Sequence, residues 1–407
     1  MSSNENPSID NATIDNPSDA TIDIEQLTEQ ANAGDAIAQF YLGTAYSLGM
    51  NVPVDRAKAI EWWEKAAAGD SKEAQFMLGQ CYHFGQGTTQ DIEQAAYWYE
   101  QAAQNGHPQA QLNIATMLLS GTGMPQNDTQ AVQWLERAAQ EGSDKAAIAL
   151  GRLYEEGKGT PIDLEQAFHW FTRAAEQDNA EAQYSLGLMY SRGEFVAQDD
   201  LEAVQWFCKA ADQNFVLAQF ELGQCYFQGT GTEQDYRQSY DWFQKAADNG
   251  NPVAHYKLGL MVANGLGCDR DAQKIAHHIR TAAEAGYLEA QHLLGMMYYK
   301  GKDVEQNHQE AITWFQKAAQ AEFAEAQFML GLVYLNELEN YTAAFHWNQH
   351  AAQQNNPHAQ YNLAYQYQHG LGTEKDPAQA LHWFQQCQTH ATGELAQQAT
   401  QAAAALS

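Results

Sequence analysis

Basic residues are scarce in this chain. Its 407 residues include 21 Lys and Arg against 51 Asp and Glu, which gives a formal charge of −30 at pH 7. A field of this sign repels nucleic acid and anionic membrane surfaces, so we expect neither as a partner. No Lys or Arg occurs before Arg56. Residues 1–22 are polar and acidic and have too little apolar surface to offset the entropy of ordering, so they are predicted to form a disordered N-terminal tail.

Long apolar runs are also missing. No stretch stays apolar for the roughly 18 residues that a membrane-spanning helix needs. Residues 1–7 have neither the basic segment nor the apolar run of a secretory signal peptide. The expectation is therefore a cytoplasmic protein without a membrane span.

Cysteine is rare and shows no pairing pattern. The five cysteines form no CxxC motif and no even-numbered framework, which agrees with a cytoplasmic location. Cys81 and Cys225 occupy a register that we expect to be buried, so they are interpreted as small core residues. Cys208 and Cys225 fall on successive predicted helices, and a disulfide between them is the alternative.

Catalytic and metal-binding motifs are absent as well. The sequence has no phosphate-binding GxxxxGK[ST] loop, no GxSxG and no HExxH. His346 and His350 are four residues apart on a predicted helix, which is a zinc-ligand spacing, but no third ligand is placed near them by spacing. Surface histidines are the simpler interpretation. We therefore predict no catalytic residue, no metal, no cofactor and no enzyme activity.

What the chain does have is an internal repeat. A phrase that begins Ala38-Gln39-Phe40 returns every 36 residues as far as Ala326, and a tenth copy starts 33 residues later at Ala359. A fixed period of this size indicates stacked supersecondary units. The prediction is a solenoid of ten repeats of about 36 residues over residues 23–390, preceded by the tail. The first helices of the repeats are expected to start near residues 36, 72, 108, 144, 180, 216, 252, 288, 324 and 357.

Each repeat is predicted to be a helix-turn-helix. In repeat 2, Ala74, Leu78 and Cys81 recur at helical spacing and so share one face of the first helix. Gly79 stands in the middle of this helix, and every copy has Gly or Ala there, which indicates that another helix passes close by. Gly85 suits the helix end, and the Asp or Asn after the turn suits the N-cap of the second helix.

The second helix carries a Trp at one register in nine of the ten repeats, as at Trp98, and His278 takes this place in repeat 7. Because the register follows the helix period, core packing is favoured over a stacking platform for a ligand. At the ends of the solenoid, residues 24–34 are expected to supply a first partner helix and residues 391–407 a C-terminal capping helix.

The phrase Ala-x-Ala-Gln-x-x-Leu-Gly-x-x-Tyr, followed by Gly-x-Gly and then by Ala-x-x-Trp-[Phe/Tyr]-x-Lys-Ala-Ala, resembles the Sel1-like repeat family. Repeat 6 shows its first half well over residues 217–231. The resemblance implies an all-α, right-handed α/α superhelical solenoid related to tetratricopeptide repeats, with the first helices lining the concave surface. It also implies an adaptor that assembles or regulates other proteins. Repeat 9 departs from the pattern, because residues 336–340 replace the Gly-x-Gly turn.

If the first helices line a groove, its exposed stripe consists of the residue before the buried Leu and those two and six positions after it. This stripe has four basic residues against two acidic ones, in contrast to the whole chain. We therefore predict that a protein or peptide with acidic groups binds there. The Asn and Gln side chains of the stripe would hydrogen-bond to the backbone of this partner. The alternative is that six charges are too few to indicate anything. The predicted partner-binding residues are Gln80, Phe84, Arg152, Arg192, Gln224, Gln228, Lys257, Asn264, Met296, Lys300, Asn336 and Tyr365.

The function predicted from the sequence is a non-catalytic scaffold for protein–protein interaction, bacterial in the style of its repeats and monomeric by default. An immunity-type inhibitor of a toxin is an alternative within the same class. An enzyme is a third, since some relatives have been linked to β-lactam binding, but no Ser-x-x-Lys centre stands in a suitable context.

Overall fold

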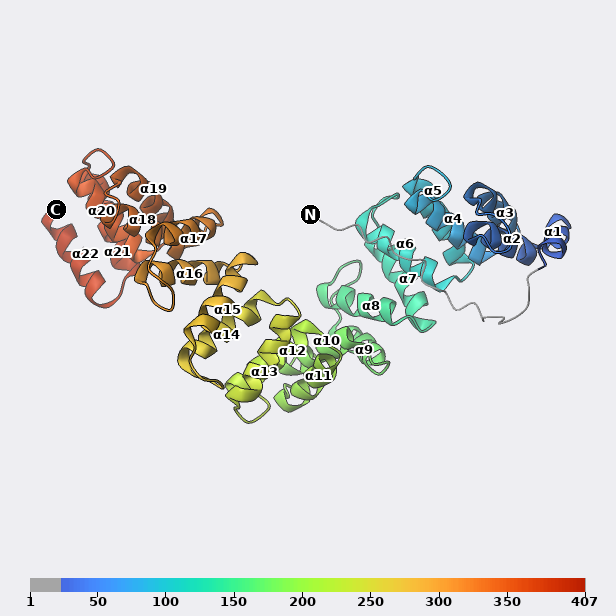
Figure 1. Cartoon of the computed structure of the whole chain (residues 1–407), viewed down its shortest axis with the longest axis horizontal. Helices are drawn as coiled ribbons and strands as arrows, with labels where there is room; N and C mark the ends of the chain where they lie inside the picture. Colours follow the sequence, from blue (N-terminus) through green and yellow to red (C-terminus); the bar gives the residue numbers. More distant parts are fainter. Residues whose placement is uncertain (1–22, 407) are drawn as a thin grey trace. The chain divides into compact units, whose positions relative to one another are not determined.

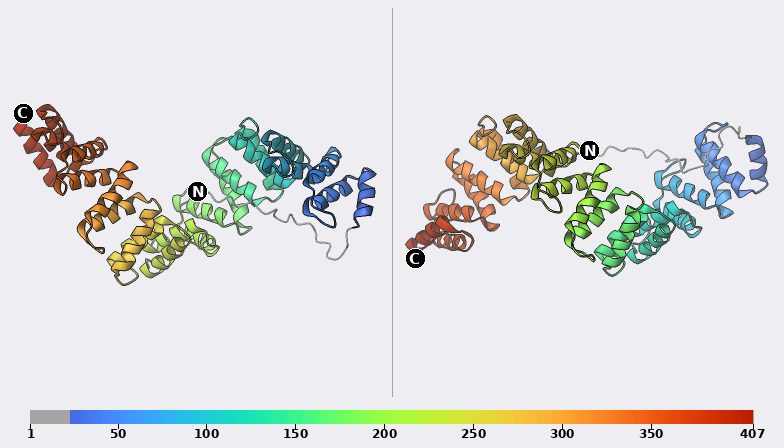
Figure 2. Two further views of the ribbon diagram at one scale, coloured as in Figure 1. Left: turned by 45° about the horizontal axis from the view of Figure 1, so that its top comes forward. Right: turned by 90° about the horizontal axis from the view of Figure 1, so that it is seen from below.

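The structure, a computed structural model, describes residues 23–406, which form 22 α-helices and no β-strand. The chain divides into two units, with unit 1 ending at Ala182 and unit 2 starting at Gln183. Within each unit, consecutive helices form antiparallel hairpins that stack on one another (Figure 1), and two further views show the same pairing (Figure 2). The all-α solenoid expected from the repeat is confirmed. The predicted tail, residues 1–22, lies outside the described residues.

Unit 1 begins with α1 (Ile24–Asn32), which packs on the first repeat through Ile24 and Leu27. Its first helices are α2 (Ala36–Leu48), α4 (Lys72–Phe84), α6 (Pro108–Ser120) and α8 (Asp144–Glu156). Its second helices are α3 (Arg56–Ala68), α5 (Ile92–Gln104), α7 (Asp128–Gln140) and α9 (Leu164–Ala175).

The next first helix, α10 (Ala180–Arg192), carries the division between the units. The other first helices of unit 2 are α12 (Val216–Gln228), α14 (Pro252–Asn264), α16 (Leu288–Lys300), α18 (Ala324–Asn336) and α20 (Pro357–His369). Its second helices are α11 (Asp200–Asp212), α13 (Tyr236–Asp248), α15 (Ala272–Glu284), α17 (His308–Gln320), α19 (Tyr341–Gln353) and α21 (Pro377–His390). The last helix, α22 (Gly393–Leu406), places Ala399 and Ala403 in the same core cluster as Phe384.

Local signals in the sequence set the helix ends. Each second helix has Asp or Asn at its N-cap; in α3, for example, Asp55 Oδ1 accepts a hydrogen bond from the Lys58 backbone N–H at 3.0 Å. This bond satisfies one of the backbone donors that a helix start leaves free. At the other end, Gly85 and its equivalents adopt the left-handed conformation as C-caps of the first helices. Both predictions are confirmed.

The glycine in the first helix marks a close approach. A Cβ atom on Gly79 would lie 2.5 Å from the Tyr99 ring, and one on Gly151 would lie 2.4 Å from Phe171. Both aromatic residues are buried, and they follow the Trp register by one position on the second helix. The small residue therefore makes room for a large side chain, as the sequence predicts.

The Trp register itself lies at the edge of the core. Trp134, Trp170 and Trp314 are buried, whereas the other six tryptophans of this register are half-buried. In six repeats a Lys or Arg three residues later covers the ring; Lys245 Nζ, for example, lies 3.5 Å from the centroid of Trp242. The stem of the basic side chain covers apolar surface, and its charge interacts with the ring.

The buried Gln of the Ala-Gln phrase joins consecutive repeats. Gln75 Nε2 on α4 donates to the Ala67 carbonyl on α3, and Asn105 Nδ2 at the end of α5 donates to Gln75 Oε1 at 3.0 Å. Gln219, Gln327 and Gln360 make similar pairs of bonds. Each Gln thus binds the second helix on either side of it.

Candidate partner-binding surface

The candidate surface is the first-helix stripe, which consists of the residues one before and two and six after the buried Leu of each first helix. All twelve predicted binding residues are accessible. Four of them are half-buried, namely Gln80, Gln224, Lys257 and Met296, and eight are exposed, namely Phe84, Arg152, Arg192, Gln228, Asn264, Lys300, Asn336 and Tyr365. Their role as a binding site, and the concave shape of the surface, stay predictions.

The two arginines of the stripe already have acidic partners. In unit 1, Arg152 on α8 forms an ion pair with Glu181. In unit 2, Arg192 Nη1 lies 3.7 Å from Glu194 Oε1. These carboxylates reduce the positive charge that the arginines offer to a partner, which the spacing of the sequence did not show.

The two lysines of the stripe differ from the arginines. Over residues 23–406, neither Lys257 on α14 nor Lys300 on α16 has an ion pair within 4.0 Å. Lys257 is half-buried and Lys300 is exposed. These lysines are the basic positions of the stripe that remain available to a carboxylate of a partner.

Several polar residues of the stripe contact their own helix. Asn264 Nδ2 donates to the Leu260 carbonyl at 2.7 Å, and Gln224 Nε2 donates to Glu221 Oε2 at 3.3 Å. Burial raises the pKa of Glu221, while the bond from Gln224 and the charge of Arg192 oppose this shift. Glu221 is thus held within a local network.

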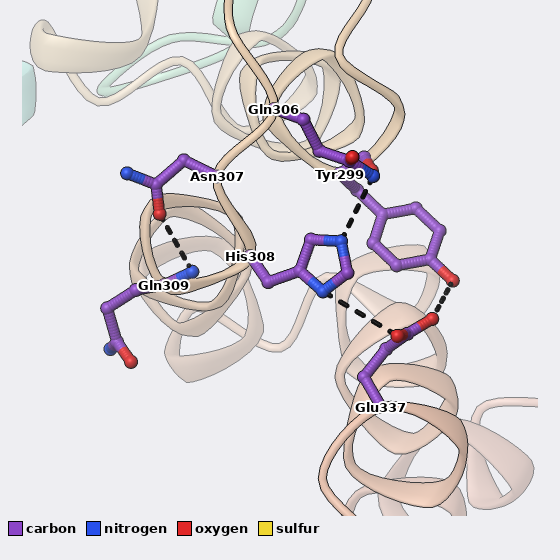
Figure 3. Close-up of polar contacts among 6 residues, drawn as sticks. All are labelled: Tyr299, Gln306, Asn307, His308, Gln309 and Glu337. Carbon is purple, nitrogen blue, oxygen red and sulfur yellow. Dashed lines mark hydrogen bonds and ion pairs between the residues drawn. The ribbon is translucent and has the colours of Figure 1, made fainter.

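The irregular repeat 9 forms a polar cluster that the sequence did not predict (Figure 3). Glu337 stands where the other repeats have a C-cap Gly, and it accepts a hydrogen bond from the Tyr299 hydroxyl at 3.1 Å. Its second oxygen lies 3.7 Å from His308 Nδ1 at the start of α17, and His308 Nε2 lies 3.1 Å from Gln306 Nε2 (Figure 3). The replaced glycine was the signal for this contact. The cluster joins repeat 9 to repeat 8 where the regular turn is missing.

Repeat 7 contains a second unpredicted cluster. His255 replaces the buried Gln, His278 replaces the Trp, and their Nδ1 atoms lie 3.1 Å apart. The ring of His277 lies 5.3 Å from that of His278. Burial, followed by the charges of His255 and His277, lowers the pKa of His278 to about 4. In the sequence, the departure of His255 and His278 from the repeat pattern was the signal that could have indicated this cluster.

The cysteines and histidines suggest little other chemistry. All five cysteines are free; Cys81 is buried as expected, whereas Cys225 is only half-buried. The rings of His346 and His350 lie 4.6 Å apart. In the part of the chain that the structure describes, no three or more His, Cys, Asp or Glu residues are grouped so as to hold a metal ion.

Within residues 23–406, none of the helices is both long enough and apolar enough to cross a membrane.

Comparison with protein families finds the Sel1 repeat ten times. The matched segments are residues 36–71, 72–107, 108–143, 144–179, 180–215, 216–251, 252–287, 288–323, 324–356 and 357–386. Together they cover most of the chain. A comparison with curated proteins gave no match.

Solved structures give the same result. The chain is 36% identical to a protective antigen of uropathogenic Escherichia coli strains that displays this repeat fold, with a TM-score of 0.73 over 90% of this chain and 79% of that one. It is 28% identical to a Sel1 repeat protein from Oxalobacter formigenes, with a TM-score of 0.51 over 93% of this chain and 89% of that one. An immunity protein from Pseudomonas aeruginosa is 20% identical over 56% of this chain and 81% of its own, with a TM-score of 0.32.

Sel1 repeat proteins generally mediate protein–protein interaction and are generally non-catalytic. The ten matched segments, the paired helices of every repeat and the similarity to the antigen all agree. The chain belongs to the Sel1 repeat family.

Proposed function

We propose that this chain is a scaffold that binds a protein or peptide along its first-helix stripe. The observation that carries the proposal is that, within each first helix, the buried positions stay nearly the same from repeat to repeat while the accessible ones vary. The Ala, Leu and Gly positions are buried and nearly the same in every repeat, as in Ala254, Leu258 and Gly259. The stripe positions are accessible and change from repeat to repeat. A surface of this kind can be specific for a partner without disturbing the core.

The charges of the stripe indicate where acidic groups of the partner bind. Arg152 and Arg192 have carboxylates of this chain beside them, whereas within residues 23–406 Lys257 and Lys300 form no ion pair. We therefore place acidic groups of the partner at the two lysines, in unit 2. The field of a chain with a formal charge of −30 disfavours any acidic partner that lacks such local contacts.

Charge reversal at the two lysines tests the proposal. The variant Lys257→Glu with Lys300→Glu serves as bait in a pull-down from the source cells, with captured proteins quantified by mass spectrometry. The matched control reverses Lys274 and Lys375, which are exposed but lie outside the stripe. We expect the partner captured by the unaltered chain to be reduced at least about tenfold by the first variant, because like charges now meet.

The control should capture the partner as the unaltered chain does. Circular dichroism and thermal melting should agree among all three proteins, since none of the four lysines is buried. Equal capture by both variants would remove the first-helix stripe from the proposal.

A further inference from the structure

A small pocket in unit 1 lies where α2, α3 and α4 meet. Its volume is about 10 Å³, which is room for one water-sized group. Its mouth adjoins the first-helix stripe, since Met77 and Gln80 belong to both. Its wall includes Ser47, Arg56, Trp63, Met77, Gln80 and Cys81.

Cys81 is a small residue in the wall of this pocket. Its register, three residues after the buried Leu, holds Met117, Leu153, Met189, Met261 and Met297 in other repeats. These longer side chains are buried in their own repeats. The thiol of Cys81 fills less of the equivalent space, and so leaves an opening beside the indole of Trp63.

Arg56 gives the pocket a positive charge without a partner. Within residues 23–406 its guanidinium makes no ion pair and no side-chain hydrogen bond. Arg56 is also the first residue of α3, where the helix dipole disfavours a cation. Burial raises the pKa of the Cys81 thiol to about 11, so this thiol stays neutral at pH 7 and does not balance the charge. An uncompensated cation at this place is a ready ligand for a carboxylate.

Exposed apolar side chains lie on two of the helices that form the pocket. Leu48 follows Ser47 on α2, and Tyr41 lies two turns before Leu48 on the same face of that helix. Phe84 lies one turn beyond Gln80 on α4. The side chains of Leu48, Tyr41 and Phe84 are 49%, 45% and 50% exposed, respectively. They add apolar surface on α2 and α4, two of the three helices that form the pocket.

We propose that the pocket receives one oxygen of the carboxylate of an acidic side chain in a partner peptide, whose neighbouring apolar residues pack on Tyr41, Leu48 and Phe84. Arg56 and the Gln80 amide supply the donors. One carboxylate oxygen fits the water-sized volume and the single guanidinium. A phosphate is larger and doubly charged, so the field of the chain repels it more strongly. This inference rests on the proposed function and gives the chemistry of one segment of the partner.

The test uses short fluorescent peptides and the full chain, with binding measured by anisotropy. One peptide has a central Glu flanked by Leu and Phe, a second has Gln in place of that Glu, and a third has Ser in place of the apolar residues. The variants are Arg56→Gln, which removes the charge, and Cys81→Met, which fills the pocket with the side chain that other repeats hold at this register. Arg237→Gln is the control, because Arg237 also lies exposed in the first turn of a second helix.

We expect the unaltered chain and Arg237→Gln to bind the Glu peptide at least about tenfold more tightly than the other two peptides, and both pocket variants to lose this preference. Thermal melting checks that the variants fold. The inference is overturned if the unaltered chain does not prefer the Glu peptide, or if Arg56→Gln keeps the preference. In that case the proposed function still stands as long as the Lys257 and Lys300 variant loses its partner.

Discussion

Gly79 shows how a single residue sets the distance between the two helices of a repeat. Glycine in the middle of a helix costs about 1 kcal/mol relative to alanine, so its presence needs a compensating contact. That contact is with the Tyr99 ring, which lies 2.5 Å from the place that a Cβ atom on Gly79 would take. In repeat 3 the same two positions are Ala115 and Leu135, a larger residue opposite a smaller one. The two positions therefore share one volume.

We predict that Gly79→Ala lowers the free energy of unfolding by about 1 kcal/mol, because overpacking against Tyr99 outweighs the gain in helix propensity. Chemical denaturation measures the change. In a Tyr99→Leu background, which reproduces the combination of repeat 3, the same Gly79→Ala change should be neutral or stabilising. An equal loss in both backgrounds would show that the ring is not the cause.

The histidine pair of repeat 7 makes stability depend on pH. The pKa of His278 is lowered in the fold, from an ordinary value of 6.5 to about 4, by burial and then by His255 and His277. The charge of Lys274 contributes to this lowering, whereas that of Asp248 on α13 opposes it. The unfolded chain therefore binds this proton more readily than the folded one. The contribution of His278 to stability is complete above about pH 6.5 and is lost as the pH falls towards 4.

The double variant His255→Gln with His278→Trp gives repeat 7 the residues that most other repeats have. We expect its melting temperature to fall less between pH 7 and pH 5 than that of the unaltered chain, as differential scanning calorimetry would show. The exposed His382→Gln serves as the control and should behave like the unaltered chain. The same fall in all three proteins would place the pH dependence elsewhere.

At the scale of elements, the buried Gln side chains connect one hairpin to the next. Gln75 is 3% exposed and bonds to both α3 and the end of α5. In a solenoid each repeat contacts only its neighbours. The two hydrogen bonds of each buried Gln therefore contribute directly to the coupling between repeats.

We predict that Gln75→Leu lowers the free energy of unfolding by about 1–3 kcal/mol, because the Ala67 carbonyl and the Asn105 amide lose a partner in a buried place. The exposed Gln94→Leu is the control and should change stability by less than about 0.5 kcal/mol. Hydrogen exchange should increase in α3, α4 and α5 of the first variant. Unchanged exchange there would show that this joint does not couple the repeats.

At the scale of the whole molecule, the sequence predicts the features that follow from the 36-residue period. It does not predict contacts between side chains of different repeats. The repeat gives the helices, their caps and the small residue at Gly79, because each follows from local spacing. It also indicates which first-helix residues are accessible. It could not show that Arg152 meets Glu181, since that contact joins side chains of separate repeats. The pocket beside Cys81 was missed because it depends on a volume difference between repeats.

The proposed binding mode places the partner against the first helices. Photo-crosslinking tests this placement most directly, with a photoreactive amino acid placed in turn at Gln228, Asn264 and Lys300 on first helices, and at Gln205, Gln238 and Thr313 on second helices of the same unit. All six positions are exposed, so none should prevent folding. We predict that the captured partner crosslinks from the first-helix positions and not from the second-helix positions. Crosslinks from the second helices alone would contradict the proposed binding mode.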